Sequence, residues 1–138
     1  SFMNPYRRTK ILIPEPEYFT PESVRRMSRV GQVVAKRMTR KELLRQVHKF
    51  NALLVRIETK VDKSLIAKAK NLECVVSATT GLNHIDLKTL KRRNIPLFSL
   101  EGTHSLATAE HTLALLLAAA RKIPWANQSM TQGHWKRC

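Results

Sequence analysis

Residues 52–87, ALLVRIETKVDKSLIAKAKNLECVVSATTGLNHIDL, contain two apolar runs separated by a segment with the composition of a helix. The runs at 52–57 and 73–78 are rich in Val, Leu and Ile without strict alternation of apolar and polar residues, which is typical of strands covered on both faces. The segment at 62–70 begins with Asp62, a candidate N-cap. A strand, a helix and a second strand in this order predict a βαβ unit with parallel strands.

The same alternation continues on both sides of this unit. Further strands are expected at 10–14, 32–36 and 95–99, and further helices at 22–30, 40–49, 86–93 and 106–122. Because crossovers between parallel strands are right-handed, these elements predict an α/β fold, a doubly wound parallel sheet of about five strands in the flavodoxin-like order. Thr39 and Asp86 are further candidate N-caps, and Gly31 follows a predicted helix at a position that favours a left-handed cap residue.

The long helix expected at 106–122 contains neither Gly nor Pro, and Pro124 marks its end. Its middle, at 113–117, is apolar on every side, and a helix of this kind needs burial on more than one face. One side can pack on the domain that precedes it. We therefore expect the other side to contact another domain or a second copy of the chain, which would form a homodimer through this helix.

Basic residues outnumber acidic ones by 25 to 10, which gives a formal net charge of +15. A charge of this size is compatible with a polyanionic partner or a phosphorylated substrate. The basic residues are nevertheless spread as pairs and triplets over every predicted helix, and the chain has only four Phe, two Trp and two Tyr to stack on bases. We therefore interpret most of this charge as solvated surface and do not expect a nucleic-acid partner.

The sequence disfavours several other kinds of site and location. No apolar run reaches the roughly 18 residues of a membrane span, and the first residues lack a signal pattern, so a cytoplasmic protein without membrane contact is expected. Cys74 lies in an apolar run and Cys138 at the last position, and with five scattered histidines they have no metal-ligand spacing. The four glycines lie far apart and do not form a dinucleotide-binding fingerprint.

The loop at 79–86 is the first candidate for a binding site. Ligands of doubly wound sheets bind beyond the carboxyl ends of the strands, and this loop follows a buried strand and opens a helix there. Its backbone amides could bind an anion, with Gly81 allowing close approach. The alternative is an ordinary turn capped by Asp86.

Three side chains near the same edge could also contact a ligand. Arg56 ends the third strand, where its guanidinium could bind a carboxylate or phosphate through two parallel hydrogen bonds. The alternative for Arg56 is an ion pair with Glu58 or Glu15. His104 and Thr108 flank the start of the last helix, and the alternative for His104 is a loop residue without a role in binding.

Four segments together resemble a known family. They are LVRIETKV at 54–61, ATTGLNHIDL at 78–87, AEHTLALLL at 109–117 and ARKIP at 120–124. In this order and at these intervals they resemble the D-isomer-specific 2-hydroxyacid dehydrogenases, and among these the 3-phosphoglycerate dehydrogenases most. The resemblance covers nearly the whole chain, from Lys10 to Arg137.

The resemblance implies a flavodoxin-like substrate-binding domain at 1–104, followed at 105–138 by a helix and connector that lead toward an NAD-binding domain. It implies that Arg56 contacts the acidic substrate. It also implies that the backbone amides of Thr80 and Gly81 receive the carboxylate of that substrate.

Three more positions carry implications for the ligands. Thr108 matches the helix start that lies beside the nicotinamide of NAD in such enzymes. His104, a substrate-binding candidate, stands where phosphoglycerate dehydrogenases commonly have Asn, and Ile57 stands where many have Ser. These two departures leave the identity of the 2-hydroxy acid open.

The family's catalytic arginine, glutamate and histidine belong to the NAD-binding domain and its far end, which this chain lacks. We therefore expect no catalytic residue here and an isolated chain that is inactive. The implied role is the N-terminal substrate-binding part of an NAD-dependent oxidoreductase that moves a hydride between NAD and a small acidic 2-hydroxy or 2-oxo acid. The alternative is a stand-alone regulatory, dimerisation or nucleic-acid-binding module.

Overall fold

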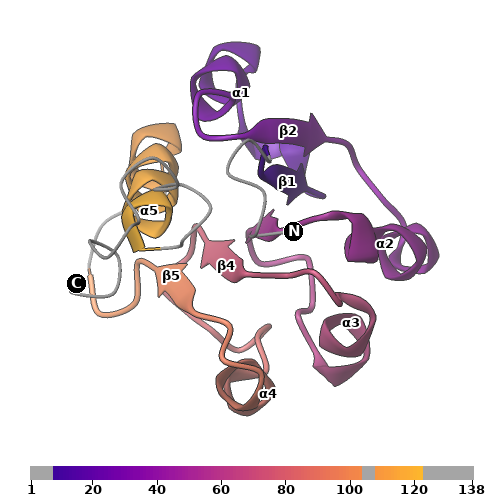
Figure 1. Cartoon of the computed structure of the whole chain (residues 1–138). Helices are drawn as coiled ribbons and strands as arrows, with labels where there is room; N and C mark the ends of the chain where they lie inside the picture. Colours follow the sequence, from indigo (N-terminus) through magenta and orange to yellow (C-terminus); the bar gives the residue numbers. More distant parts are fainter. Residues whose placement is uncertain (1–7, 104–107, 123–138) are drawn as a thin grey trace, which may run out of the picture.

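The computed structural model describes residues 8–103 and 108–122 of the chain, in which short strands alternate with helices (Figure 1). The strands are β1 (Lys10–Ile13), β2 (Gln32–Ala35), β3 (Ala52–Val55), β4 (Cys74–Ser77) and β5 (Leu97–Ser99). The α-helices are α1 (Pro21–Met27), α2 (Arg40–Gln46), α3 (Lys63–Lys68), α4 (Leu87–Arg92) and α5 (Ala109–Lys122), and two 3-10 turns are η1 (Pro16–Tyr18) and η2 (Val47–Lys49).

The strands form one parallel sheet in the order β2-β1-β3-β4-β5, which confirms the predicted flavodoxin-like topology. β1 is an interior strand, because Ile11 pairs with Val33 of β2 on one side and with Ala52 of β3 on the other. The direction of winding reverses between β1 and β3. A sheet of this kind offers its binding crevice beyond the carboxyl ends of these two strands.

Helices cover both faces of the sheet, and the strands are apolar on both faces for that reason (Figure 1). Ile11 and Ile13 pack into the core beneath α1 and α5, whereas Leu12 packs into the core beneath α2, α3 and α4. All four residues of β3 and all four of β4 are buried. The absence of a polar and apolar alternation in the sequence therefore reflects this double cover.

The predicted helix starts are confirmed at three caps. Thr39 forms a capping box with Glu42, and Asp62 and Asp86 each accept a hydrogen bond from the N–H three residues further on, at 3.0 and 3.1 Å. The ends were predicted less well, since α2 ends at Gln46 and the 3-10 turn Val47–Lys49 replaces its expected last turn. Strong local capping signals mark the starts, and no comparable signal marks the ends.

The prediction of a left-handed cap at Gly31 was wrong. Among the described residues, only Gly102 and Asn94 have positive φ values, of 82° and 55°. Gly31 is instead required by close packing, because a Cβ there would lie 2.5 Å from the carbonyl oxygen of Thr9. The chain passes β1 so closely at this point that only glycine fits.

The helix α5 is buried along one face. Thr112, Leu116 and Ala119 are buried where α5 packs on α1, β4 and β5. Leu117 on another face remains 46% exposed. Of the other residues of the predicted 106–122 helix, Thr108 precedes the first turn of α5, and 106 and 107 lie outside the described residues. The observed packing thus covers one side of this apolar helix, as expected, and leaves a leucine of another side in solvent.

Candidate functional site

The carboxyl ends of β1 and β3 are joined by a buried carboxylate. Glu15 has no exposed surface, and its two oxygens accept hydrogen bonds from the backbone N–H groups of Arg56, Glu58 and Thr59 at 2.8, 3.1 and 3.1 Å. Three N–H donors offset the cost of burying this charge. Glu15 therefore fixes the loop at 56–59, which presents Arg56.

Arg56 is half-buried, and its guanidinium lies over the ring of Tyr18, 4.0 Å from the ring centroid. The ring attracts the cation and orients its plane. The Nε of Arg56 is buried and has no hydrogen-bond partner. The ion-pair alternative is not supported, because Glu15 binds the backbone of Arg56 and the guanidinium forms no ion pair with Glu58 or Glu15 in the described part of the chain.

The loop at 79–84 is braced by a chain of hydrogen bonds. The Thr79 hydroxyl donates its one hydrogen to the carbonyl oxygen of Gly81 at 2.8 Å, so the Ser77 hydroxyl, at 2.6 Å, donates to Thr79. The Ser77 oxygen must then accept from Nε2–H of His84 at 3.0 Å. This assignment places the hydrogen of His84 on Nε2.

Burial lowers the pKa of His84, and the negative charge of Glu15 opposes that shift. The depressed pKa favours neutral imidazole at pH 7. The loop is also tied to the segment between β3 and α3, because Val61 N–H donates to the carbonyl oxygen of His84 at 2.8 Å. His84 therefore shapes this loop and adds no positive charge to it at neutral pH.

Thr80 and Gly81 form the exposed tip of the loop. Their backbone N–H groups donate no hydrogen bond within the described residues. A Cβ added at Gly81 would meet nothing within 4 Å, so the space above this backbone is open. Two unpaired amides and an arginine thus lie in loops at the carboxyl ends of the adjacent strands β3 and β4, an arrangement suited to an anion. We call these groups, Arg56, Thr80 and Gly81, the mouth.

The two remaining predicted site residues have different outcomes. His104 lies outside the described residues. Thr108 is exposed, and its hydroxyl oxygen accepts the N–H of His111 at 3.1 Å at the start of α5. Thr108 therefore caps this helix, and its hydroxyl hydrogen remains able to serve a ligand.

Other basic side chains beside the mouth are paired with carboxylates. Arg37 donates to both Glu17 and Glu58, and this contact lowers the pKa of Glu17. Arg40 pairs with Asp62 and donates to a backbone carbonyl oxygen at 2.8 Å. These two arginines are neutralised, whereas Arg56 has no carboxylate partner among residues 8–103 and 108–122.

The sequence reasoning underestimated Glu15 and did not identify Tyr18, Ser77 or His84 as parts of this site. Glu15 stands between two prolines directly after a buried strand, and a carboxylate at that place was the available signal. The contacts of Ser77 and His84 depend on a loop geometry that no local pattern encodes.

The described residues offer no metal site, no reactive thiol and no membrane-spanning helix. No group of three His, Cys, Asp or Glu side chains within them could hold a metal ion. Cys74 is fully buried, which raises the pKa of its thiol to about 12 and makes it unreactive. Nor does any helix in this part of the chain have the length and hydrophobicity to cross a bilayer.

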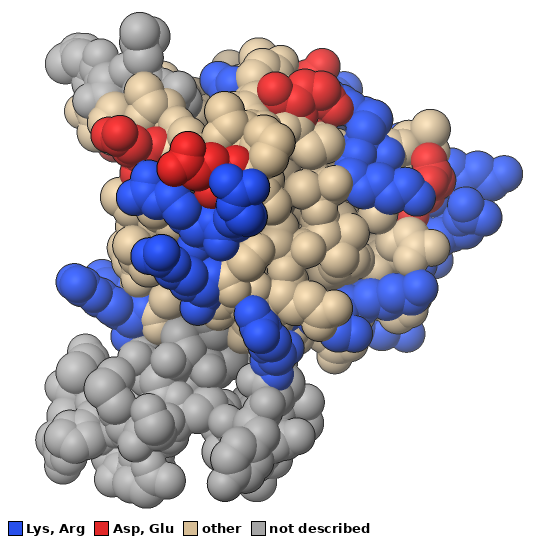
Figure 2. Space-filling view, turned by 90° about the horizontal axis from the view of Figure 1, so that it is seen from above, with Lys and Arg blue, Asp and Glu red and all other residues tan. Residues whose placement is uncertain are grey.

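Positive charge is spread over the surface in several separate groups on the face seen in Figure 2, and some of these groups adjoin acidic side chains. This distribution agrees with the scattered pairs and triplets of the sequence. It does not form the continuous stripe that is typical of a nucleic-acid-binding face.

The chain is similar in sequence to one known family of proteins. A family model described as D-isomer specific 2-hydroxyacid dehydrogenase, catalytic domain, matches residues 12–135. D-3-phosphoglycerate dehydrogenase of Archaeoglobus fulgidus is 41% identical over 130 residues, covering 93% of this chain and 24% of the relative. The enzyme of the same name from Methanocaldococcus jannaschii is 35% identical over 129 residues, again covering 93% and 24%. The chain thus spans about a quarter of the length of the curated relatives it matches.

Solved structures share the fold. A Thermus thermophilus protein matches with a TM-score of 0.61 and 29% identity, over 81% of this chain and 37% of the other. A Pyrococcus horikoshii protein matches with a TM-score of 0.64 and 24% identity, over 94% of this chain and 39% of the other. Both similarities extend over most of the described residues.

Proposed function

The chain belongs to the D-isomer-specific 2-hydroxyacid dehydrogenase family, and from this membership we propose that it is the substrate-binding part of an NAD-dependent enzyme that resembles 3-phosphoglycerate dehydrogenase. The reaction is hydride transfer between NAD and a small acidic 2-hydroxy acid. The observation that carries the proposal is the mouth, where, among the described residues, the Arg56 guanidinium lacks a carboxylate partner and two backbone amides are unpaired.

The mouth recognises the carboxylate of the substrate. The amides of Thr80 and Gly81 donate to one carboxylate oxygen each, and the Arg56 guanidinium supplies the opposing charge. Tyr18 holds the guanidinium plane in place, so less side-chain freedom is lost when the substrate binds. Neutral His84 keeps the loop in shape without competing for the anion.

The cofactor is bound mainly outside this chain. When it is bound, NAD acts as the hydride acceptor. No Gly-rich phosphate-binding loop occurs in this sequence, so the residue we assign to the cofactor is Thr108, whose hydroxyl can donate one hydrogen bond. We accordingly propose that residues 1–104 bind substrate, that residues 105–138 lead toward an NAD-binding domain, and that the isolated chain binds substrate without turning it over.

We further propose that two chains associate through the 106–122 helix, in the cytoplasm. The exposure of Leu117 supports this association, and the free thiol of Cys74 is compatible with a reducing compartment. Light scattering over a range of concentrations tests the association. A Leu117→Gln variant should shift the protein toward monomer, and a wild-type chain that stays monomeric at all concentrations contradicts the proposal.

Steady-state kinetics of the intact enzyme test the substrate site. Arg56→Ala removes a charge-assisted pair of hydrogen bonds and should raise KM for 3-phosphoglycerate by about 10- to 100-fold while the melting temperature changes little. Arg26→Ala removes the same charge from an exposed position on α1. It is the matched control and should leave KM unchanged. An Arg56→Ala enzyme with the wild-type KM removes Arg56 from the site.

A further inference from the structure

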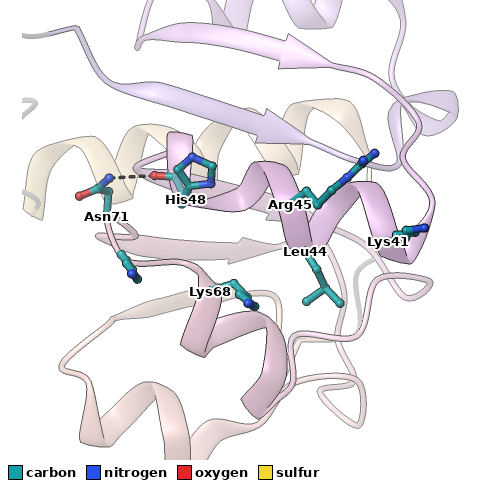
Figure 3. Close-up of a pocket in the computed structure, with 7 residues that line it drawn as sticks. Lys41, Leu44, Arg45, His48, Lys68 and Asn71 are labelled. Carbon is teal, nitrogen blue, oxygen red and sulfur yellow. Dashed lines mark hydrogen bonds between the residues drawn. The ribbon is translucent and has the colours of Figure 1, made fainter.

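A second hollow lies away from the mouth, between α2 and the end of α3. It has a volume of about 700 Å³. We call it the α2–α3 groove, and it is lined by Lys41, Leu44, Arg45, His48, Lys68, Lys70 and Asn71 (Figure 3). The mouth residues do not line it. His48 precedes β3, and Lys70 and Asn71 precede β4, so this end of the groove lies at the amino ends of the strands.

The lining of the groove carries positive charge without compensation. Four of its residues are Lys or Arg, and no Asp or Glu lines it. In the described part of the chain none of these four forms an ion pair, although Arg45 contributes to a lowered pKa of Glu42 on the same helix. Cations that line one hollow without a carboxylate among them give it a positive potential, which favours a bound anion.

Two other hollows on the molecule show that this composition is particular to the groove. The hollow that contains Arg37 and Arg40 is also lined by Glu58 and Asp62, which pair with them. The hollow that contains Lys10, Lys36 and Lys49 is also lined by Glu42. Each of these two hollows therefore contains its own counter-charge, whereas the α2–α3 groove does not.

The end of the groove is held in place by amide side chains. Asn71 Nδ2 donates to the carbonyl oxygen of His48 at 2.8 Å, a contact drawn in Figure 3. Asn51, which is nearly buried, accepts from Lys10 N–H at 3.0 Å and donates to the carbonyl oxygen of Asn71 at 3.4 Å. These bonds tie the turn after α3 to η2 and to β1. The groove is thus formed before any ligand arrives.

We propose that the α2–α3 groove binds a small molecule that carries at least two phosphate groups, at a site separate from the mouth. Its volume fits a ligand of this size, and Lys and Arg are the side chains that bind phosphate. No Phe, Tyr or Trp lines it, and the single imidazole of His48 does not form the row of rings on which successive bases stack in a nucleic-acid site. This proposal goes beyond the proposed function and does not depend on it.

Calorimetry with inorganic tripolyphosphate tests the proposal on the full chain. The double variant Lys68→Glu with Lys70→Glu should weaken binding at least about 10-fold, because two charge-assisted contacts become repulsive. The matched control combines Arg26→Glu on α1 with Arg29→Glu in the turn that follows α1, both at exposed positions. It makes the same change in net charge and should alter the affinity less than about 2-fold. Equal weakening by both variants overturns the proposal.

Two further measurements use the wild-type chain, so they do not depend on whether a variant folds. The first locates the bound anion, and the second compares tripolyphosphate with a nucleic acid. In the wild-type chain, tripolyphosphate should protect Lys68 and Lys70 from acetylation more than it protects Lys63, at the start of α3, as read by mass spectrometry. Uniform protection overturns the proposal. Single-stranded DNA should bind more weakly than tripolyphosphate in the same buffer, and tighter binding of DNA identifies a nucleic-acid surface instead.

Discussion

The two ends of the sheet differ in how far their charged side chains are paired, and Arg56 of the mouth is an exception at the carboxyl end. At the carboxyl end, Glu15 is buried and saturated by backbone amides, and Arg37 and Arg40 are paired with carboxylates. At the amino end of the sheet, Lys68 and Lys70 of the α2–α3 groove have no ion-pair partner within the described residues. The comparison teaches that net charge does not locate a site in this protein. What matters is which groups the fold leaves without a partner.

The largest effect should come from the carboxylate that organises the mouth. Glu15→Ala leaves three backbone N–H groups, one buried and two partly buried, without an acceptor and should lower the free energy of unfolding by about 3 kcal/mol, as measured by urea titration. Glu17→Ala removes an exposed carboxylate from the same end of the sheet and should cost much less. Equal losses in both variants would show that Glu15 has no special role.

The next effect contrasts two glycines at opposite ends of the sheet. Gly31→Ala places a Cβ 2.5 Å from a backbone oxygen and should destabilise the chain by about 2 kcal/mol. Gly81→Ala meets nothing within 4 Å and should leave the melting temperature nearly unchanged. In the intact enzyme, however, Gly81→Ala should raise KM for the acidic substrate, because its methyl group enters the space that the carboxylate needs. A Gly81→Ala enzyme with normal KM would separate the loop tip from the substrate.

A smaller effect should come from the aromatic ring that supports Arg56. Tyr18→Leu removes the cation–π contact and should raise KM about 2- to 5-fold in the intact enzyme, with kcat nearly unchanged. Tyr18→Phe retains the ring and should restore the wild-type KM. If Tyr18→Phe behaves like Tyr18→Leu, the hydroxyl rather than the ring face is responsible.

The smallest effect concerns pH. The pKa of His84 is lowered in the folded chain, so the unfolded chain binds more protons near pH 6. The contribution of neutral His84 to the free energy of unfolding should therefore be fully present above about pH 6.5 and should decline as the pH falls below this value. His84→Gln should flatten this decline between pH 7.5 and 5.5, and a decline of unchanged steepness would contradict the assignment to His84. The carboxylates with lowered pKa values, such as Asp62 and Asp86, titrate at lower pH and do not obscure this window.

Much of the fold could be predicted because its signals are local. The five apolar runs, and the caps at Thr39, Asp62 and Asp86, each depend on a few adjacent residues. Arg56, Thr80 and Gly81 could be named as candidates because they follow strands whose carboxyl ends share one edge. The role of Glu15 in holding the loop at 56–59 could not be predicted, since its three partners lie 41 to 44 residues further along the chain. The reason for Gly31 was missed in the same way, because it depends on contact with Thr9.

The link from Glu15 to the loop after β3 also sets an order of events during folding. The segment from β3 to α4 can form by contacts between neighbours in sequence, but this link closes a loop of more than 40 residues and must await the pairing of β1 with β3. The mouth is therefore among the last parts of the sheet to acquire its final shape. During refolding, the recovery of substrate binding should lag behind the recovery of helix content. A chain that binds substrate has therefore already paired β1 with β3.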